Sequence, residues 1–182
     1  NCPNVSNYLQ DDGDGNGAYQ IHARGFNADG SQRIARLTVN TQSAGQQRNP
    51  VVGTDDGGGF VVAWEDDQGD DGNFKIRARG FTSNGRQRFA DQQVHAVAGG
   101  QHLRPALAVA GSGAFAVAWQ DDNDGNGTYQ IRAVGFDAQG AASLSERTIN
   151  SVADGQQLAP GLALDGSGGL AVIWQDDLDG ND

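Results

Sequence analysis

A period of 55 residues runs through the sequence and limits its fold more strongly than any other feature. The markers that recur at this spacing are a proline, a tryptophan and a glycine–phenylalanine pair: Pro50, Pro105 and Pro160; Trp64, Trp119 and Trp174; Gly25-Phe26, Gly80-Phe81 and Gly135-Phe136. A fixed period of about 50 residues is typical of an array built from one repeated supersecondary unit. We therefore divide the chain into repeat 1 (1–49), repeat 2 (50–104), repeat 3 (105–159) and a partial repeat 4 (160–182).

Each repeat has the pattern of four short strands joined by tight turns. In repeat 3, residues 105–110 and 115–119 are apolar, and the second run is continuous enough to be buried on both faces. Residues 129–136 alternate, and residues 143–150 form a more polar fourth strand. The tryptophans lie in the second strand, so we expect core positions rather than a ligand platform. We predict an all-β repeat protein of four-stranded, antiparallel, propeller-like blades, with about 3.3 repeats and an incomplete ring.

An acidic, glycine-rich stretch follows the second strand of every repeat. In repeat 3, Asp122, Asp124 and Asn126 stand at alternate positions before Gly127, which is the first half of a calcium loop. Repeat 1 and the C-terminus have the same spacing, whereas the copy in repeat 2 has Gly69 at the middle position. The proposed Ca²⁺ ligands are Asp12, Asp14 and Asn16; Asp67 and Asp71; Asp122, Asp124 and Asn126; and Asp177, Asp179 and Asn181. The preceding residues, Asp11, Asp66, Asp121 and Asp176, are predicted as extra ligands or as acceptors behind the ligands.

These stretches are not EF-hands, because the flanking residues read as strands. The twelfth position, counted from Asp12 or Asp122, holds an alanine instead of the bidentate glutamate. The alternative is a plain polar hairpin turn, since Asp, Asn and Gly are the usual turn residues. The repetition of the stretch in four places favours calcium.

The charge of the chain narrows its partners. Its formal net charge is −11, and 15 of its 23 acidic residues lie in the four acidic stretches. This argues against nucleic acid or an anionic membrane as partner. No apolar run approaches the ~20 residues that span a bilayer. Because weak calcium modules work at extracellular calcium concentrations, we expect a secreted protein.

Two phrases of repeat 2 carry a resemblance to a known class. Residues 59–64, the acidic stretch and residues 74–81 resemble a tandem repeat of large bacterial secreted and adhesin proteins, and the loops resemble the calcium loops of integrin-type propellers. The resemblance implies a propeller-like fold and an extracellular location at the bacterial cell surface. It implies no catalytic residue.

The sequence gives little sign of a catalytic centre. The three histidines, His22, His95 and His102, are not at a metal-ligand spacing, and no G-x-S-x-G motif is present. Two carboxylates can hydrolyse glycosides, but here the acidic pairs are duplicated along the repeats. We therefore predict that the chain is not an enzyme.

Two functions remain open. The first is a calcium-stabilised structural or adhesive protein that assembles with itself into a filament or ring. It rests on a chain that begins and ends on a second strand, which also fits a fragment of a longer array. The second is a calcium-dependent, lectin-like module that binds surface glycans.

Overall fold

The computed structural model describes residues 18–97 and 99–177, and in this part of the chain every regular element is a β-strand. The all-β prediction is therefore confirmed for these residues. None of them belongs to a helix that is long and apolar enough to cross a membrane. The strands are β1 (His22–Phe26), β2 (Gln32–Thr38), β3 (Gln46–Thr54), β4 (Phe60–Asp67), β5 (Lys75–Phe81), β6 (Gln87–Gln93), β7 (Gln101–Val109), β8 (Phe115–Asp122), β9 (Gln130–Phe136), β10 (Ala142–Thr148), β11 (Gln156–Leu164) and β12 (Leu170–Asp177).

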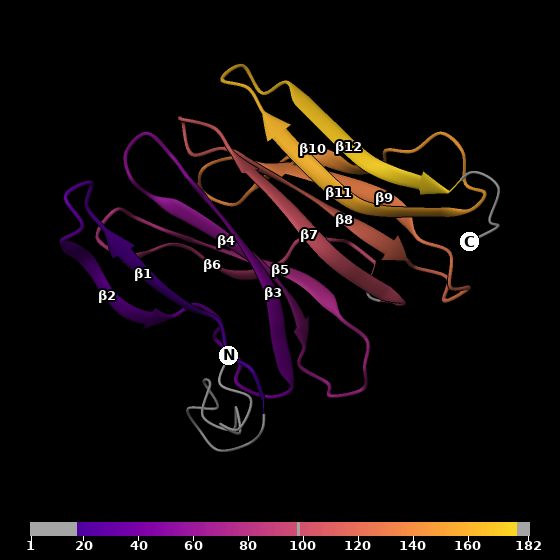
Figure 1. The fold of residues 1–182 in the computed structure, drawn as a ribbon, viewed down its shortest axis with the longest axis horizontal. Coiled ribbons are helices and arrows are strands. Elements are labelled where there is room, and N and C mark those ends of the chain that lie inside the picture. Colours follow the sequence, from indigo (N-terminus) through magenta and orange to yellow (C-terminus); the bar gives the residue numbers. More distant parts are fainter. Residues whose placement is uncertain (1–17, 98, 178–182) are drawn as a thin grey trace, which may run out of the picture.

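The strands form four antiparallel sheets in chain order, which we number one to four. The first sheet is β1-β2, the second β3-β4-β5-β6, the third β7-β8-β9-β10 and the fourth β11-β12 (Figure 1). In the two four-stranded sheets every strand pairs with its neighbour in sequence, as short hairpin connections require. The repeated four-stranded unit is thus confirmed, while the closed ring or propeller stays a prediction.

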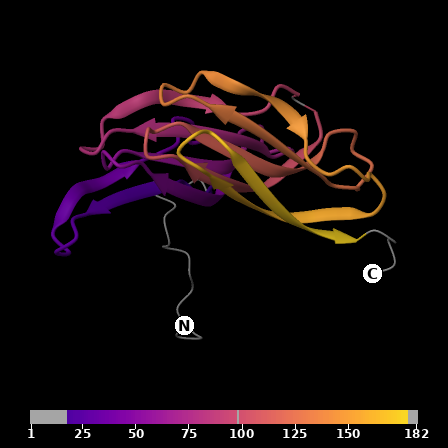
Figure 2. The same ribbon diagram turned by 90° about the horizontal axis from the view of Figure 1, so that it is seen from above.

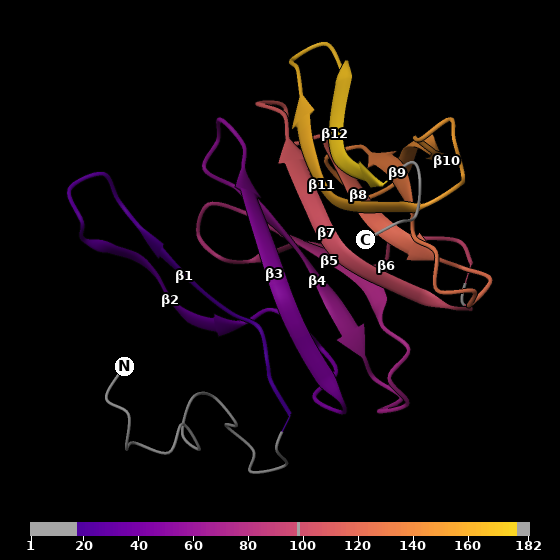
Figure 3. The same ribbon diagram turned by 45° about the vertical axis from the view of Figure 1, so that its right-hand side comes forward.

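The first strands of consecutive sheets lie against one another. β7 contacts β3 on one side and β11 on the other, and the three strands run side by side in Figure 3. β3, β7 and β11 each begin four residues before the proline of their repeat. The predicted repeat boundaries at residues 50, 105 and 160 therefore fall inside these strands.

A bulge precedes each of these prolines and ties one sheet to the next. The pairing register shifts between Arg48 and Val51 and at the two equivalent places, and the residue before each proline has a φ of 50°. At two bulges a side chain from the preceding sheet accepts a hydrogen bond from the backbone N–H that the bulge leaves unpaired. Glu65 Oε1 accepts from Arg104 N at 2.7 Å, and Gln120 Oε1 accepts from Ala159 N at 2.9 Å. A hydrogen bond of this kind contributes about 0.5–1.5 kcal/mol.

The apolar core lies between the sheets, which follow one another in Figure 2 from indigo to yellow. One cluster joins the first and second sheets around Trp64, and another joins the second and third around Trp119. Both indoles are fully buried. Every residue of β4 and β8 is buried, which confirms that these strands are covered on both faces. β12 instead alternates, and Ile173 is 73% exposed where the equivalent Ala118 is 0% exposed.

Candidate functional site

The acidic pairs are the last two residues of the second strands and not part of the loops. β4 ends on Asp66-Asp67, β8 on Asp121-Asp122 and β12 on Asp176-Asp177. Successive side chains of a strand point to opposite faces, so the two members of a pair meet different surroundings. The other predicted ligands in repeat 1 and at the C-terminus lie outside the described residues: Asp11, Asp12, Asp14, Asn16, Asp179 and Asn181.

In the second and third sheets the second member of the pair organises the hairpin that follows it. Asp122 accepts a hydrogen bond from Asn126 N at Oδ1 (3.0 Å) and one from Gly127 N at Oδ2 (3.1 Å). Asp67 makes the same two bonds to the amides four and five positions further on (3.1 and 3.0 Å). The carboxylate thereby fixes the turn through main-chain donors, as Asp does in Asx-type turns.

The alternate residues of the loops bond to each other and to the backbone. Asp124 Oδ2 accepts from Asn126 Nδ2 (2.9 Å), Asn126 Oδ1 accepts from Thr128 N (2.7 Å), and Asp71 Oδ1 accepts from Asn73 N (2.9 Å). The structure thus brings Asp122, Asp124 and Asn126 together in one loop. No group of three or more acidic, histidine or cysteine side chains converges on one point within residues 18–97 and 99–177.

The first member of each pair is held by the neighbouring first strand. Each of these aspartates stands directly opposite a polar side chain in the cross-strand register and bonds to it. The pairs are Gln47 Nε2 with Asp66 Oδ1 (3.1 Å), His102 Nδ1 with Asp121 Oδ1 (2.7 Å) and Gln157 Nε2 with Asp176 Oδ1 (3.1 Å). The three partners are 55 residues apart, so this is a feature of the repeat that sequence reasoning missed.

A third polar residue, also repeated every 55 positions, extends each pair to a row of three neighbouring polar side chains, which we call the relay. Asn40 Nδ2 lies 3.4 Å from Gln47 Oε1, and Asn150 Nδ2 lies 3.3 Å from Gln157 Oε1. The equivalent residue between the second and third sheets is His95, whose ring stacks on that of His102 with centroids 3.7 Å apart. The relay is therefore Asn–Gln–Asp twice and His–His–Asp once.

His95 is buried as the neutral imidazole. Its Nε2 accepts a hydrogen bond from Ile76 N (3.2 Å), while Nδ1 faces the carbonyl of Val97 at 2.5 Å. Burial is the main cause that lowers the pKa of His95 to about 4, and repulsion by His102 adds to it. The ring therefore satisfies one donor and one acceptor without carrying charge.

The pKa values of Asp66 in the second sheet and Asp121 in the third sheet are shifted in opposite directions. Burial raises the pKa of Asp66, and the bond from Gln47 offsets this only in part. Burial also acts to raise the pKa of Asp121, but hydrogen bonds from His102 and Trp119 outweigh it, so that this pKa is lowered. The protein thus stabilises the charged form of Asp121 more than that of Asp66.

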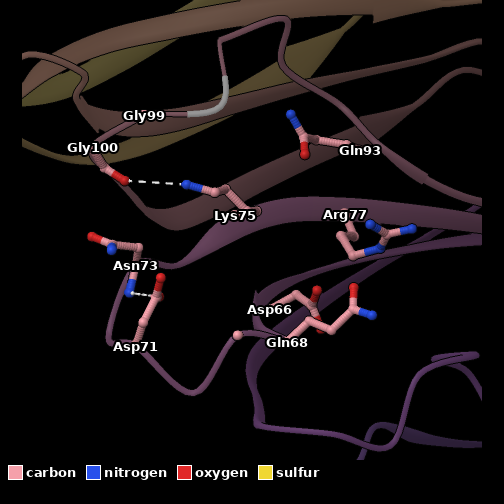
Figure 4. Close-up of a pocket in the computed structure, with 10 residues that line it drawn as sticks. Asp66, Gln68, Asp71, Asn73, Lys75, Arg77, Gln93, Gly99 and Gly100 are labelled. Carbon is pink, nitrogen blue, oxygen red and sulfur yellow. Dashed lines mark hydrogen bonds between the residues drawn. The ribbon is translucent and has the colours of Figure 1, made fainter.

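A polar pocket lies beside the hairpin loop of the second sheet, and an equivalent pocket lies beside that of the third. The second-sheet pocket is a cavity of about 350 Å³, with Asp66, Asp71, Asn73, Lys75, Arg77 and Gln93 among its walls (Figure 4). The third-sheet pocket has about 550 Å³ and includes Asp124, Asn126, Thr128, Gln130, Thr148 and Asp154. Seven lining positions recur 55 residues apart: 69 and 124, 71 and 126, 73 and 128, 75 and 130, 93 and 148, 99 and 154, and 100 and 155.

The connector from the fourth strand to the next sheet closes each pocket. Gly100 lines the second-sheet pocket and Gly155 the third-sheet one. Gly100 has a φ of 72°, and a Cβ there would lie 2.0 Å from the carbonyl oxygen of Asp122. The repeated glycine was the available sequence signal for this wall, but it gave no hint of a pocket.

The two pockets differ in charge. The second-sheet pocket contains Lys75 and Arg77, whereas the lining of the third-sheet pocket contains the carboxylates of Asp124 and Asp154 and no cation. Arg77 is paired with Asp91 (Nε to Oδ1, 2.5 Å), and Lys75 Nζ lies 3.4 Å from the carbonyl of Gly100. Repetition of the backbone therefore does not mean repetition of the ligand.

Comparison with known proteins gives no family for the chain. No protein-family profile matches it, and no curated protein matches its sequence. Among solved structures, the fold is similar to an endo-arabinase from Bacteroides thetaiotaomicron, with a TM-score of 0.47 and 12% identity over 75% of this chain. The chain corresponds to 52% of that protein's length.

This similarity corrects one prediction from the sequence. The prediction that the chain is not an enzyme is corrected: the endo-arabinase is an enzyme, and the repeats of this chain therefore do not exclude an enzymatic fold. No catalytic residue is carried over from it to this chain.

Proposed function

We propose that the protein is a repeat-built carbohydrate-binding module, in which propeller-like blades each offer one polar pocket between the hairpin loop and the next sheet. The observation that carries this proposal is the recurrence of the pocket at the same register in two consecutive sheets. The repeated backbone places the hairpin loop and the connector in the same positions in both sheets, so the pocket recurs with the 55-residue period. Each repeat thereby supplies the main-chain walls of a site, and the side chains of that repeat decide what the site can bind.

The lining favours a polyhydroxylated ligand. Carboxylates accept hydrogen bonds, the ammonium of Lys75 donates them, and amide side chains do both. Sugar hydroxyls both donate and accept, so they can satisfy all three kinds of group. An apolar ligand would leave these groups without partners, at a cost of about 1–3 kcal/mol for each buried one.

The proposal predicts saturable binding of sugars that centres on the pockets. Glucose, galactose, mannose and xylose are titrated one at a time into ¹⁵N-labelled protein, and amide shifts are followed by NMR. At least one sugar is expected to shift resonances of the hairpin loops and of the connectors around Gly100 and Gly155. Absence of a saturable shift with every sugar, and with oligosaccharides on an array, would refute the proposal.

A second candidate function, stabilisation by calcium, is favoured by the third-sheet pocket. Its lining combines two carboxylates with the Asn126 amide and the Thr128 hydroxyl and holds no cation. These are the oxygen ligands that Ca²⁺ takes. We propose that Asp124, Asn126 and Asp154 would hold the ion and that its charge would offset that of the two carboxylates, while Asp122, which does not line this pocket, would fix the hairpin behind them. In the second sheet Gly69 and Gly99 replace the carboxylates of residues 124 and 154, and Lys75 replaces Gln130.

Calcium is therefore expected to raise the melting temperature through the third sheet. A ligand at 100 times its Kd stabilises the folded state by about 2.7 kcal/mol. The double variant Asp124→Asn/Asp154→Asn is expected to lose this gain, whereas Asp71→Asn in the second sheet keeps it. Differential scanning calorimetry with calcium and with EDTA measures both. Equal melting temperatures of the wild type with calcium and with EDTA would exclude a calcium site. Loss of the calcium-dependent gain only in Asp71→Asn would place the site in the second sheet instead of the third.

A structural or adhesive role, secretion and self-association stay predictions of the sequence. Exposed Ile173 in β12 is the residue at which association would be probed first.

A further inference from the structure

The equivalent aspartates of the second and third sheets differ in how fully they are partnered. Asp121 Oδ1 faces His102 Nδ1 at 2.7 Å and accepts from Trp119 Nε1 at 3.1 Å, and its Oδ2 lies 4.0 Å from Arg132. Asp121 is not among the residues that line the third-sheet pocket. The oxygens of Asp121 are thus engaged by groups of the protein itself.

Asp66 has one hydrogen bond where Asp121 has several contacts. Gln47 donates to its Oδ1, and the described residues provide no hydrogen bond to its Oδ2. The indole Nε1 of Trp64, which corresponds to the donor of Trp119, is buried without a partner. The hydrogen bond from the tryptophan indole to the aspartate, which Trp119 and Asp121 make in the third sheet, is therefore not made by Trp64 and Asp66 in the second sheet.

Asp66 is among the residues that line the second-sheet pocket, although it is only 3% exposed. Burial raises its pKa, which shows that the protein itself compensates the charge incompletely. A buried polar group that lacks a partner costs free energy, and a ligand that supplies the partner recovers it. Donors line the same pocket: Lys75 and Arg77 lie on β5, which pairs with the strand of Asp66, and Figure 4 shows Lys75 directed toward Gly100.

We propose that the second-sheet pocket is the sugar-selective site of the protein and that Asp66 Oδ2 accepts a hydrogen bond from a ligand hydroxyl, while Lys75 donates to an adjacent hydroxyl. This rests on the proposed function and assigns it to one pocket. Lys75 is suited to the donor role because its one hydrogen bond to the described residues is a 3.4 Å contact with the Gly100 carbonyl, which is easily exchanged. Arg77 is held by Asp91 and shapes the wall.

The assignment is tested with Asp66→Asn, which preserves the volume and the acceptor for Gln47 but removes the charge. The affinity for the sugar that binds the wild type, measured by the NMR titration, is expected to fall on the order of tenfold or more, because hydrogen bonds to charged groups are the strong ones. The fold is expected to be retained, since a buried charge is removed. Lys75→Gln, a surface change that copies the third sheet, is expected to weaken binding as well and provides a second variant that cannot fail through the core.

The matched controls are in the third sheet. Asp121→Asn is expected to lower stability and leave the affinity unchanged, because Asp121 does not line the third-sheet pocket. A wild type that binds sugar while Asp66→Asn and Lys75→Gln bind it equally well overturns this inference alone. Loss of binding in Asp124→Asn instead places the site in the third sheet and also overturns it. A wild type that binds none of the sugars overturns the proposed function first.

Discussion

Replacement of Trp119 by Ala is expected to lower the free energy of unfolding by about 3–5 kcal/mol, the usual cost of removing a large buried aromatic side chain. Trp119 is 0% exposed and lies in the cluster that joins the second and third sheets. The change also removes the Nε1 donor to Asp121. Urea denaturation followed by circular dichroism measures the loss.

The chain provides its own controls for this prediction. Trp174 is only partly buried, so Trp174→Ala is expected to cost clearly less. Trp64 is as buried as Trp119, but its Nε1 has no partner, so Trp64→Phe is expected to cost less than Trp119→Phe. Equal losses at positions 119 and 174 would contradict the packing described here.

Acidification is expected to destabilise the joint between the second and third sheets by about 3 kcal/mol between pH 6.5 and about 4. The folded protein lowers the pKa of His95 from 6.5 to about 4, and each pKa unit corresponds to 1.36 kcal/mol. In this window the unfolded chain binds the proton and the folded chain does not, so stability falls as the pH falls. Protonation would also turn Nε2 into a donor facing the Ile76 N–H.

The groups that act on His95 are His102 and Lys75, which disfavour its charge, and Asp121, which favours it. The double variant His95→Asn/His102→Gln introduces the Asn and Gln that stand at the equivalent positions 40 and 47, and 150 and 157. It is expected to abolish the loss of stability between pH 6.5 and 4, as measured by urea denaturation at a series of pH values. An unchanged pH profile in this variant would show that other groups cause the acid sensitivity.

Much of the fold could be predicted because it is written locally and repeatedly. The apolar run 115–119 predicted the buried strand, which the structure extends to Asp122. The glycine turns predicted the hairpins, and the tryptophans of repeats 2 and 3 were correctly placed in the core. Period-2 patterns and turn residues act over a few positions, so they are legible without knowing what packs on what.

The site was less legible, because its residues meet across the sheets. The sequence predicted Asp67 as a loop ligand and Asp66 as an extra ligand or an acceptor behind it, whereas the strand directs Asp66 to Gln47 and Asp67 to the hairpin amides. Gln47 is 19 residues from Asp66, and the pocket wall at Gly100 is 34 residues from it. No local pattern relates such positions.

The sequence alone determined the 55-residue unit, its four strands, its turns and its buried tryptophans, because each of these follows from short-range geometry repeated in register. Only the tertiary structure decided which aspartate of a pair bonds to the neighbouring first strand and which holds the hairpin, that a histidine pair replaces Asn and Gln between the second and third sheets, and that the repeated connectors line polar pockets of different charge. The reason is that burial, cross-strand partners and pocket walls arise from residues far apart in the chain, and only the packing of sheet upon sheet brings them within hydrogen-bonding distance.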